Sequence, residues 1–246
     1  MLPFEKFDAE HQKLWDTMKI IRDQAQLNAM AQKVLAFKHI YQEVEEDTGV
    51  PWQLVAVIHI REAGLKDVGI FKGGIHNGQT WRRKATIEPK IGPFPSWRAC
   101  ALAALTRTGL TQVGKGNWTP AKMLSAAEPY NGYGYRNVHK MLSPYLWAST
   151  NHQQRGKYIR DHVFDKTVMD TQMGVAAMLK FLGVQSKSTS VRTVPDVVKQ
   201  EGSIVTSTIT LALIFQKYII PIAIFGAIAL GTLWMYRYFS KDKTNA

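Results

Sequence analysis

The sequence contains a single cysteine, Cys100, among its 246 residues. One thiol excludes an intrachain disulfide, so the stability of the folded chain must come from packing. Cys100 lies in an alanine- and leucine-rich run, residues 99–105. Such a run is typical of a small buried thiol, and the sequence places no base or electropositive pocket beside it. We therefore assign Cys100 no chemical role.

Acidic residues are also scarce. The chain has 19 Asp and Glu against 31 Lys and Arg, which gives a formal net charge of +12. This excess favours polyanions such as nucleic acid, anionic lipid headgroups or acidic cell-wall polymers. No arginine-rich run or recognisable nucleic-acid module accompanies the charge. We therefore expect no specific nucleic-acid partner and favour a cell-wall or membrane surface.

The first residues lack the basic start and apolar core of a secretory signal peptide, because Glu5, Asp8 and Glu10 lie among them. A long apolar run lies near the other end of the chain. Residues 219–236 carry no charged side chain and would reach roughly 27 Å as a helix, close to the bilayer core of about 30 Å. This run predicts one transmembrane helix, with the lipid bilayer as its partner.

The flanks of this run leave its orientation open. Arg237, Lys241 and Lys243 follow it, and the positive-inside rule would place them in the cytoplasm, with the rest of the protein outside. A C-terminal anchor without a leader would instead leave the large domain inside. Small residues recur at every fourth position of the run and would form a face for a homo-oligomer, although such residues are common in isolated spans.

Composition divides the chain into four parts. We expect a folded domain over residues 1–185, a polar linker over 186–203, an apolar membrane-anchor region over 204–238 and a basic tail over 239–246. The folded domain has no internal repeat and few strand-like alternations, so we expect it to be mainly α.

Helical periodicity is strongest in the first third of the chain. Between Asp16 and Asp47 the apolar residues recur at alternating steps of three and four, which predicts one long amphipathic helix. The residues of this face are Leu27, Met30, Val34, Phe37, Tyr41 and Val44. Gly49 and Pro51 end it. A second helix should run from Pro51 to Glu62 and end around Gly64.

The rest of the domain alternates loops and shorter helices. Residues 64–95 are rich in Gly, Pro and Asn and predict an irregular connection of the kind that builds clefts. Ser96 is a candidate N-cap for a helix over 97–106. Later elements are a helix that begins at Thr119-Pro120, continues through Leu124 and is closed by Pro129, a loop over 130–158, and a helix over 168–182.

Glu62 is the residue most suited to chemistry. With Leu54 at zero on a helical wheel, Val55, Ile58 and Glu62 fall at about 100°, 40° and 80°, so Glu62 shares the apolar face. A partly desolvated carboxyl group has a raised pKa, which suits a general acid near neutral pH. The alternative is a glutamate paired with a basic neighbour such as Arg61, and this feature alone does not separate the two.

Several motifs, in order, resemble segments of one family of lysozyme-like peptidoglycan hydrolases found in bacteria and bacteriophages. They are Gly49-Val50-Pro51-Trp52, His59-Ile60-Arg61-Glu62, His76-Asn77-Gly78, the run from Glu128 to Arg136, Ser143-Pro144-Tyr145-Leu146-Trp147, and Gly156-Lys157-Tyr158 with Asp161. The similarity covers roughly residues 15–183 and does not extend to the predicted anchor. It implies a helical domain related in fold to lytic transglycosylases and goose-type lysozyme.

The resemblance also implies roles for residues. Glu62 takes the position of the catalytic glutamate, which protonates the glycosidic oxygen between N-acetylmuramic acid and N-acetylglucosamine. Tyr130 and Asn131 are similar to a Tyr-Asn pair that lines the sugar site, where a phenol can bond the catalytic carboxyl group. The motif with His76 and Asn77 would add substrate contacts. The family usually has Ser after the glutamate, and this chain has Ala63.

Aromatic residues add two weaker candidates. Four aromatic residues, Tyr145, Trp147, Trp81 and Trp97, could stack on sugar rings, although aromatics at such spacing more often belong to a core. We favour only Tyr145 and Trp147, which lie in the predicted loop.

A second carboxylate would serve as a nucleophile or activate water. Asp67, Glu88 and Glu128 are candidates, but no motif selects one, so a mechanism with one glutamate, assisted by the N-acetyl or 6-hydroxyl group of the substrate, fits better. Whether the product is that of a transglycosylase or a muramidase stays open.

We predict no metal and no cofactor. His59 and Glu62 lie one helical turn apart, but the chain has no His-Glu-x-x-His motif. A third ligand would have to be picked arbitrarily from His76, His139 and His152.

The sequence thus favours a membrane-anchored enzyme that cleaves peptidoglycan strands, with a phage lysis or genome-entry role implied by the resemblance. The membrane would then be that of a virion or of a host envelope.

Two alternatives from other functional classes remain open. One is an inactive wall-binding or structural membrane protein, which Ala63 supports, and the other is a holin-like permeabiliser, for which a large folded domain with one span is a poor fit.

Overall fold

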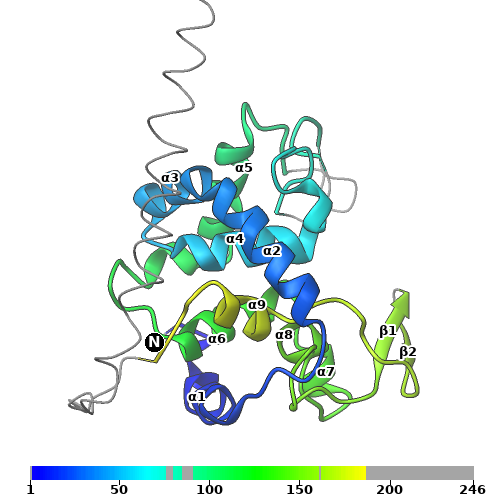
Figure 1. Cartoon of the computed structure of the whole chain (residues 1–246). Helices are drawn as coiled ribbons and strands as arrows, with labels where there is room; N and C mark the ends of the chain where they lie inside the picture. Colours follow the sequence, from blue (N-terminus) through cyan, green and yellow to red (C-terminus); the bar gives the residue numbers. More distant parts are fainter. Residues whose placement is uncertain (1, 76–79, 85–90, 161, 187–246) are drawn as a thin grey trace, which may run out of the picture. The chain divides into compact units, whose positions relative to one another are not determined.

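A computed structural model of the chain describes residues 2–75, 80–84, 91–160 and 162–186, which fall within one compact unit, Met1–Lys187 (Figure 1). This unit is mainly helical, as predicted. The predicted linker from residue 187 onward, the anchor region 204–238 with its span 219–236, and the tail 239–246 lie outside the described residues. Among the helices that are described, none combines the length and apolarity needed to cross a membrane.

Helices are the main regular structure of the described residues. The α-helices are α1 Asp8–Thr17, α2 Gln24–Ala36, α3 Lys38–Thr48, α4 Trp52–Ala63, α5 Trp97–Arg107, α6 Pro120–Asn131, α7 Gly134–Asn137, α8 Pro144–Trp147 and α9 Val175–Phe181. Three 3-10 turns, η1 Glu5–Phe7, η2 Leu65–Asp67 and η3 Leu110–Gln112, and one antiparallel hairpin of β1 Lys157–Arg160 and β2 Val163–Asp165 complete the described elements.

Helix α4 forms the centre of the core. Its residues from Leu54 to His59 are inaccessible to solvent, as expected for a helix that is apolar on nearly all sides. Helix α3 packs on one side of α4 and α9 on another. Gly64 ends α4 with a φ of 85°, and its amide donates to the carbonyl of Ile60. The predicted position of this helix is therefore confirmed.

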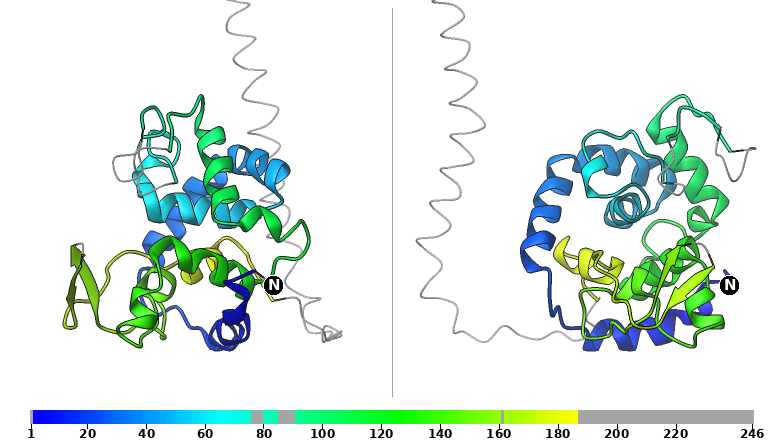
Figure 2. Two further views of the ribbon diagram at one scale, coloured as in Figure 1. Left: turned by 180° about the vertical axis from the view of Figure 1, so that it is seen from behind. Right: turned by 90° about the vertical axis from the view of Figure 1, so that its right-hand side faces the viewer.

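Most of the described helices fall into two groups. Helices α3, α4 and α5 gather in one half of the unit and α1, α6, α7 and α8 in the other, while α2 runs from one half towards the other (Figures 1 and 2). Helix α9 contacts α2, α4, α6 and α8. Gly174 precedes α9 where a Cβ atom would lie 2.5 Å from the carbonyl oxygen of Ala148, so only glycine permits this close approach.

The prediction of one helix from Asp16 to Asp47 is wrong. Its N-terminal part is interrupted because the backbone of Ile20 and Ile21 pairs instead with Ser149 and Thr150. A second break lies at Phe37, whose ring meets Gly69 and packs on Phe71. This break directs α2 onto α9 and α3 onto α4 and α5. The predicted apolar face is nonetheless buried, except that Phe37 is only partly buried.

The capping predictions are confirmed. The Ser96 hydroxyl accepts a hydrogen bond from the amide of Ala99, and the Thr119 hydroxyl accepts one from Lys122, at the starts of α5 and α6. Each cap satisfies a backbone donor that the first helical turn leaves open. Pro129 does not close α6, which continues to Asn131 and ends at Gly132 with a φ of 71°.

The last third of the unit differs most from the sequence prediction. The expected loop over 130–158 contains α7, α8 and the start of β1. Helix α9 begins at Val175 rather than 168 because the preceding backbone has other partners: the carbonyl of Val168 accepts from Gly156, and the carbonyl of Asp170 accepts from Arg22 and Gln153. These long-range bonds hold residues 168–173 in a non-helical form.

A buried polar cluster joins α1 to α6. Nδ1 of His11 lies 3.0 Å from Oγ of Ser125, and Nε2 of His11 lies 3.5 Å from Oε2 of Glu128. Arg136 donates to both carboxylate oxygens of Glu128 at 3.0 and 3.1 Å. Burial, together with the charge of Arg136, lowers the pKa of His11 to about 3. His11 is therefore neutral in the folded chain.

The stability of the domain should fall as the pH drops from 6.5, the ordinary pKa of His11, towards about 3. In this window the unfolded chain binds a proton that folded His11 does not, so the free energy of unfolding rises with pH. His11→Gln should remove this contribution. Burial raises the pKa of Glu128, which gives an opposite slope in both proteins, because Gln keeps a neutral polar side chain beside that carboxyl group.

Urea unfolding of both proteins at several pH values would isolate His11, because the difference between the two curves cancels the other groups. Parallel curves would contradict the prediction.

Candidate active site

Glu62 lies in the last turn of α4 and is partly buried. The phenol of Tyr145, in the short helix α8, donates a hydrogen bond of 2.9 Å to Oε1 of Glu62. Tyr145 is only 4% exposed. Burial raises the pKa of its phenol well above the usual value, and the charge of Glu62 raises it further. Tyr145 therefore keeps its proton and orients the carboxyl group as a donor.

A second tyrosine, Tyr130, is close enough to Glu62 for the charge of that carboxylate to affect its pKa. Tyr130 lies in the last turn of α6, with its hydroxyl 3.3 Å from Oγ1 of Thr108. Burial raises the pKa of Tyr130, and the charge of Glu62 contributes to the increase. The resemblance assigned the bond between phenol and carboxyl to Tyr130, whereas Tyr145 makes the bond that is seen. No signal in the sequence distinguishes these two tyrosines.

Arg61 is the basic neighbour of Glu62 that the sequence offered as a partner, but its guanidinium has other contacts. It lies over the ring of Tyr145, 4.5 Å from the centroid. It donates to the carbonyl of Met173 at 3.2 Å and to Oδ2 of Asp170 at 3.5 Å. The side chains of Arg61 and Glu62 therefore share one contact, the side chain of Tyr145.

The other predicted sugar contacts have mixed outcomes. Asn131 is exposed, and its amide donates to Oγ of Ser143 at 3.1 Å, which ties the end of α6 to the start of α8. Trp147 is 1% exposed, so its ring cannot stack on a sugar and belongs to the core. Tyr145 is also buried and contacts Glu62 instead. His76 and Asn77 lie outside the described residues.

Two of the three candidates for a second carboxylate, Asp67 and Glu128, form hydrogen bonds with other parts of the domain. Asp67 is bonded to His59 at 2.9 Å and to the amides of Lys72 and Gly73. Burial alone would raise the pKa of Asp67, but these hydrogen bonds outweigh it and lower the pKa. Glu128 is 1% exposed within the cluster of His11 and Arg136. Glu88 lies outside the described residues.

The histidine one turn before Glu62 has both ring nitrogens occupied. Nδ1 of His59 lies 2.9 Å from the hydroxyl of Tyr41, and its Nε2 lies 2.9 Å from Asp67. His139 contacts Tyr158, His152 contacts the carbonyl of Leu14, and His76 is not described. Within the described ranges, no three His, Cys, Asp or Glu side chains are grouped as metal ligands would be.

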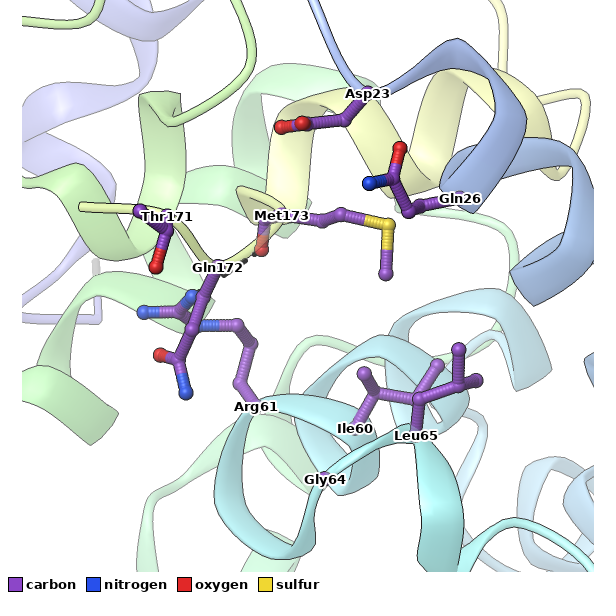
Figure 3. A pocket seen from close by; sticks show the side chains of 9 residues that line it. All are labelled: Asp23, Gln26, Ile60, Arg61, Gly64, Leu65, Thr171, Gln172 and Met173. Atoms are coloured by element: carbon purple, nitrogen blue, oxygen red, sulfur yellow. Dashed lines mark hydrogen bonds between the residues drawn. The ribbon is translucent and has the colours of Figure 1, made fainter.

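A pocket of about 230 Å³ adjoins the C-terminal end of α4 (Figure 3). Its lining combines apolar side chains with two amides, a hydroxyl, a carboxylate and a guanidinium. The residues are Asp23, Gln26, Ile60, Arg61, Gly64, Leu65, Thr171, Gln172 and Met173. Glu62 is not among them, so this pocket lies beside the carboxyl group rather than around it.

Comparisons of the chain with protein-family models, with curated proteins and with solved structures found no match.

Replacing Trp147 by alanine should lower the free energy of unfolding by about 3–5 kcal/mol, because a large buried aromatic side chain is removed and a cavity remains. Denaturant unfolding followed by circular dichroism measures the change. The matched control is Ile159→Ala, whose side chain is 53% exposed and whose loss should cost under about 0.5 kcal/mol. Similar values for the two variants would contradict the burial of Trp147.

Proposed function

We propose that this protein cleaves the glycosidic bond between N-acetylmuramic acid and N-acetylglucosamine in peptidoglycan, with Glu62 as general acid and base. The proposal includes a lysozyme-like fold for the helical domain and a membrane anchor at residues 219–236. The observation that supports it best is the bond of 2.9 Å from Tyr145 to Glu62 at the end of the buried helix α4. A carboxyl group oriented by a buried phenol is suited to proton transfer.

The chemistry follows from one carboxyl group. Protonated Glu62 gives its proton to the glycosidic oxygen, the bond between this oxygen and C1 of the muramic acid breaks, and the oxygen leaves with the electron pair. C1 becomes electron-deficient. Either the 6-hydroxyl of the same sugar or a water molecule then attacks C1, and the Glu62 carboxylate takes the proton that the attacking oxygen loses. The first route gives a 1,6-anhydro end and the second a reducing end.

The contacts of Asp67 and Glu128 support a mechanism that uses one glutamate. An inverting or retaining hydrolase needs a second carboxylate about 5–9.5 Å from the acid. Asp67 and Glu128 each hold buried or part-buried donors in place, and using either one as a base or nucleophile would require breaking those contacts. Assistance from the substrate itself requires no such change.

The basic charge of the chain fits the same function. A net charge of +12 attracts a polyanionic cell wall and raises the local concentration of substrate. An anchor at residues 219–236 would confine cleavage to wall close to a membrane. A phage lysis or genome-entry role, in a virion or host-envelope membrane, belongs to this proposal.

Glu62→Gln should lower the rate of peptidoglycan digestion by about 10²-fold or more, because an amide cannot exchange the proton. The full-length protein in mild detergent would be incubated with purified peptidoglycan, and the released muropeptides identified by mass spectrometry. The control is Glu43→Gln, an exposed glutamate paired with Arg98, which should keep full activity.

Anhydro-muramic ends that disappear in the Glu62 variant would identify a lytic transglycosylase, and reducing ends a muramidase. Binding to the wall without release of fragments would favour the inactive wall-binding alternative. Leakage of lipid vesicles without digestion would favour a permeabiliser.

Tyr145→Phe should lower kcat by about 10-fold or more, because a hydrogen bond to a charged group contributes roughly 1.5–3 kcal/mol, and KM should change little. Steady-state digestion of a soluble glycan strand measures both constants. The control is Tyr158→Phe, which removes a phenol bonded to His139. Equal effects of the two variants would show that the Glu62 contact does not assist catalysis.

A further inference from the structure

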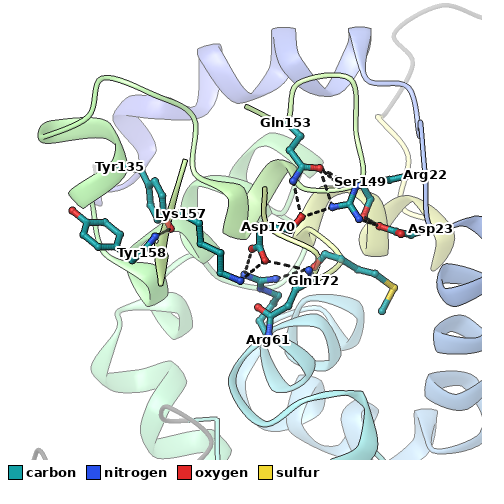
Figure 4. A network of polar contacts seen from close by, with 11 residues as sticks. Arg22, Asp23, Arg61, Tyr135, Ser149, Gln153, Lys157, Tyr158, Asp170 and Gln172 are labelled. Atoms are coloured by element: carbon teal, nitrogen blue, oxygen red, sulfur yellow. Dashed lines mark hydrogen bonds and ion pairs between the residues drawn. The ribbon is translucent and has the colours of Figure 1, made fainter. Parts of the chain in front are cut away.

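A series of alternating charges leads from the β-hairpin towards Glu62, and Figure 4 shows three of its members, Lys157, Asp170 and Arg61. Nζ of Lys157, in β1, lies 2.8 Å from Oδ1 of Asp170. Oδ2 of Asp170 accepts from Arg61 at 3.5 Å. The Arg61 guanidinium lies 4.5 Å from the centroid of the Tyr145 ring, and Tyr145 donates to Glu62. Each member thus meets a partner of complementary charge or a ring that attracts it.

Arg61, the cation of this series that contacts the Tyr145 ring, is held by several contacts. The side chain of Arg61 is 6% exposed, and its guanidinium contacts the Asp170 carboxylate, the Met173 carbonyl and the Tyr145 ring. A planar guanidinium that contacts two acceptors and an aromatic ring has little freedom to move. The position of Arg61 therefore limits where the ring of Tyr145 can lie.

Asp170 is in turn fixed from several directions. Its side chain is 4% exposed, and Oδ1 also accepts from the amide of Gln172 at 3.1 Å. Its carbonyl accepts from Arg22 and Gln153. Burial would raise the pKa of Asp170, but Lys157 and Arg61 outweigh this and lower it. Asp170 thus stays charged and in place, and Arg61 is held through it.

We propose that Arg61 is a positioning residue for Glu62, which acts through the ring of Tyr145, and that Asp170 sets the orientation of Arg61. This inference rests on the proposed function for its effect on catalysis. The alternative is that Arg61 only ties α4 to residues 170–173. A purely anchoring residue would stabilise the fold without any dependence on the hydroxyl of Tyr145.

The first test is a double-mutant cycle in the full-length protein. Arg61→Gln should lower kcat about 10-fold in the native background and less than about 3-fold in Tyr145→Phe, because the contact acts through that phenol. Arg61→Lys keeps the charge but not the planar face and should fall between. Asp170→Asn should also lower kcat, and it keeps the test valid if an Arg61 variant fails to fold.

The matched control, Arg98→Gln, removes an exposed arginine paired with Asp47 and Glu43 and should leave kcat unchanged. Equal losses in both backgrounds would overturn the proposal.

The second test does not need activity. With ¹³C-labelled tyrosine, the Cζ resonance of Tyr145, assigned by its absence in Tyr145→Phe, reports the environment of the phenol. We expect it to shift in Arg61→Gln, Asp170→Asn and Glu62→Gln, and to stay constant in Arg98→Gln. A constant resonance in the Arg61 and Asp170 variants would overturn the positioning role. Shifts as expected in a protein that does not digest peptidoglycan would overturn the proposed function alone.

Discussion

The burial of α4 on all sides up to its last turn is the constraint on which the rest of the site depends. From Leu54 to His59 the helix has no accessible surface, so it can move only if α3 and α9 move with it. Its last turn is therefore held in place, and the carboxyl group of Glu62 projects from it at a defined position. A site built on a packed helix holds its geometry better than one built on a loop.

The same burial requires that each nearby charge has a partner, because an unpaired charge in a protein interior is costly. Three groups meet this requirement around α4 and α6: Asp67 with His59, Asp170 with Arg61 and Lys157, and Glu128 with Arg136. The group of Asp170 and Arg61 also joins segments that lie 109 residues apart in the chain. The two described candidates for a second carboxylate, Asp67 and Glu128, thus have structural contacts, which is consistent with the proposed role of Glu62.

Some of the fold could be predicted because the responsible interactions are local. The hydroxyls of Ser96 and Thr119 cap helices three residues away, and the apolar sequence of α4 specifies a buried helix by itself. The errors arose where distant segments competed for the backbone. Residues 18–23 and 168–173 look helical by periodicity, but their carbonyls and amides are bonded to segments more than 100 residues away or across a loop. The turn at Phe37 likewise depends on the ring of Phe71.

The sequence by itself determined that the folded domain is mainly helical and that a carboxyl group stands at the end of a largely buried helix, because periodicity, capping and helix-ending glycine act within a few residues. Only the tertiary structure decided which tyrosine meets that carboxyl group, that Trp147 lies in the core, and that Arg61 bonds to Asp170. Tyr145 and Glu62 are 83 residues apart. Contacts at that separation depend on how helices pack against one another, and no local pattern in the sequence records that packing.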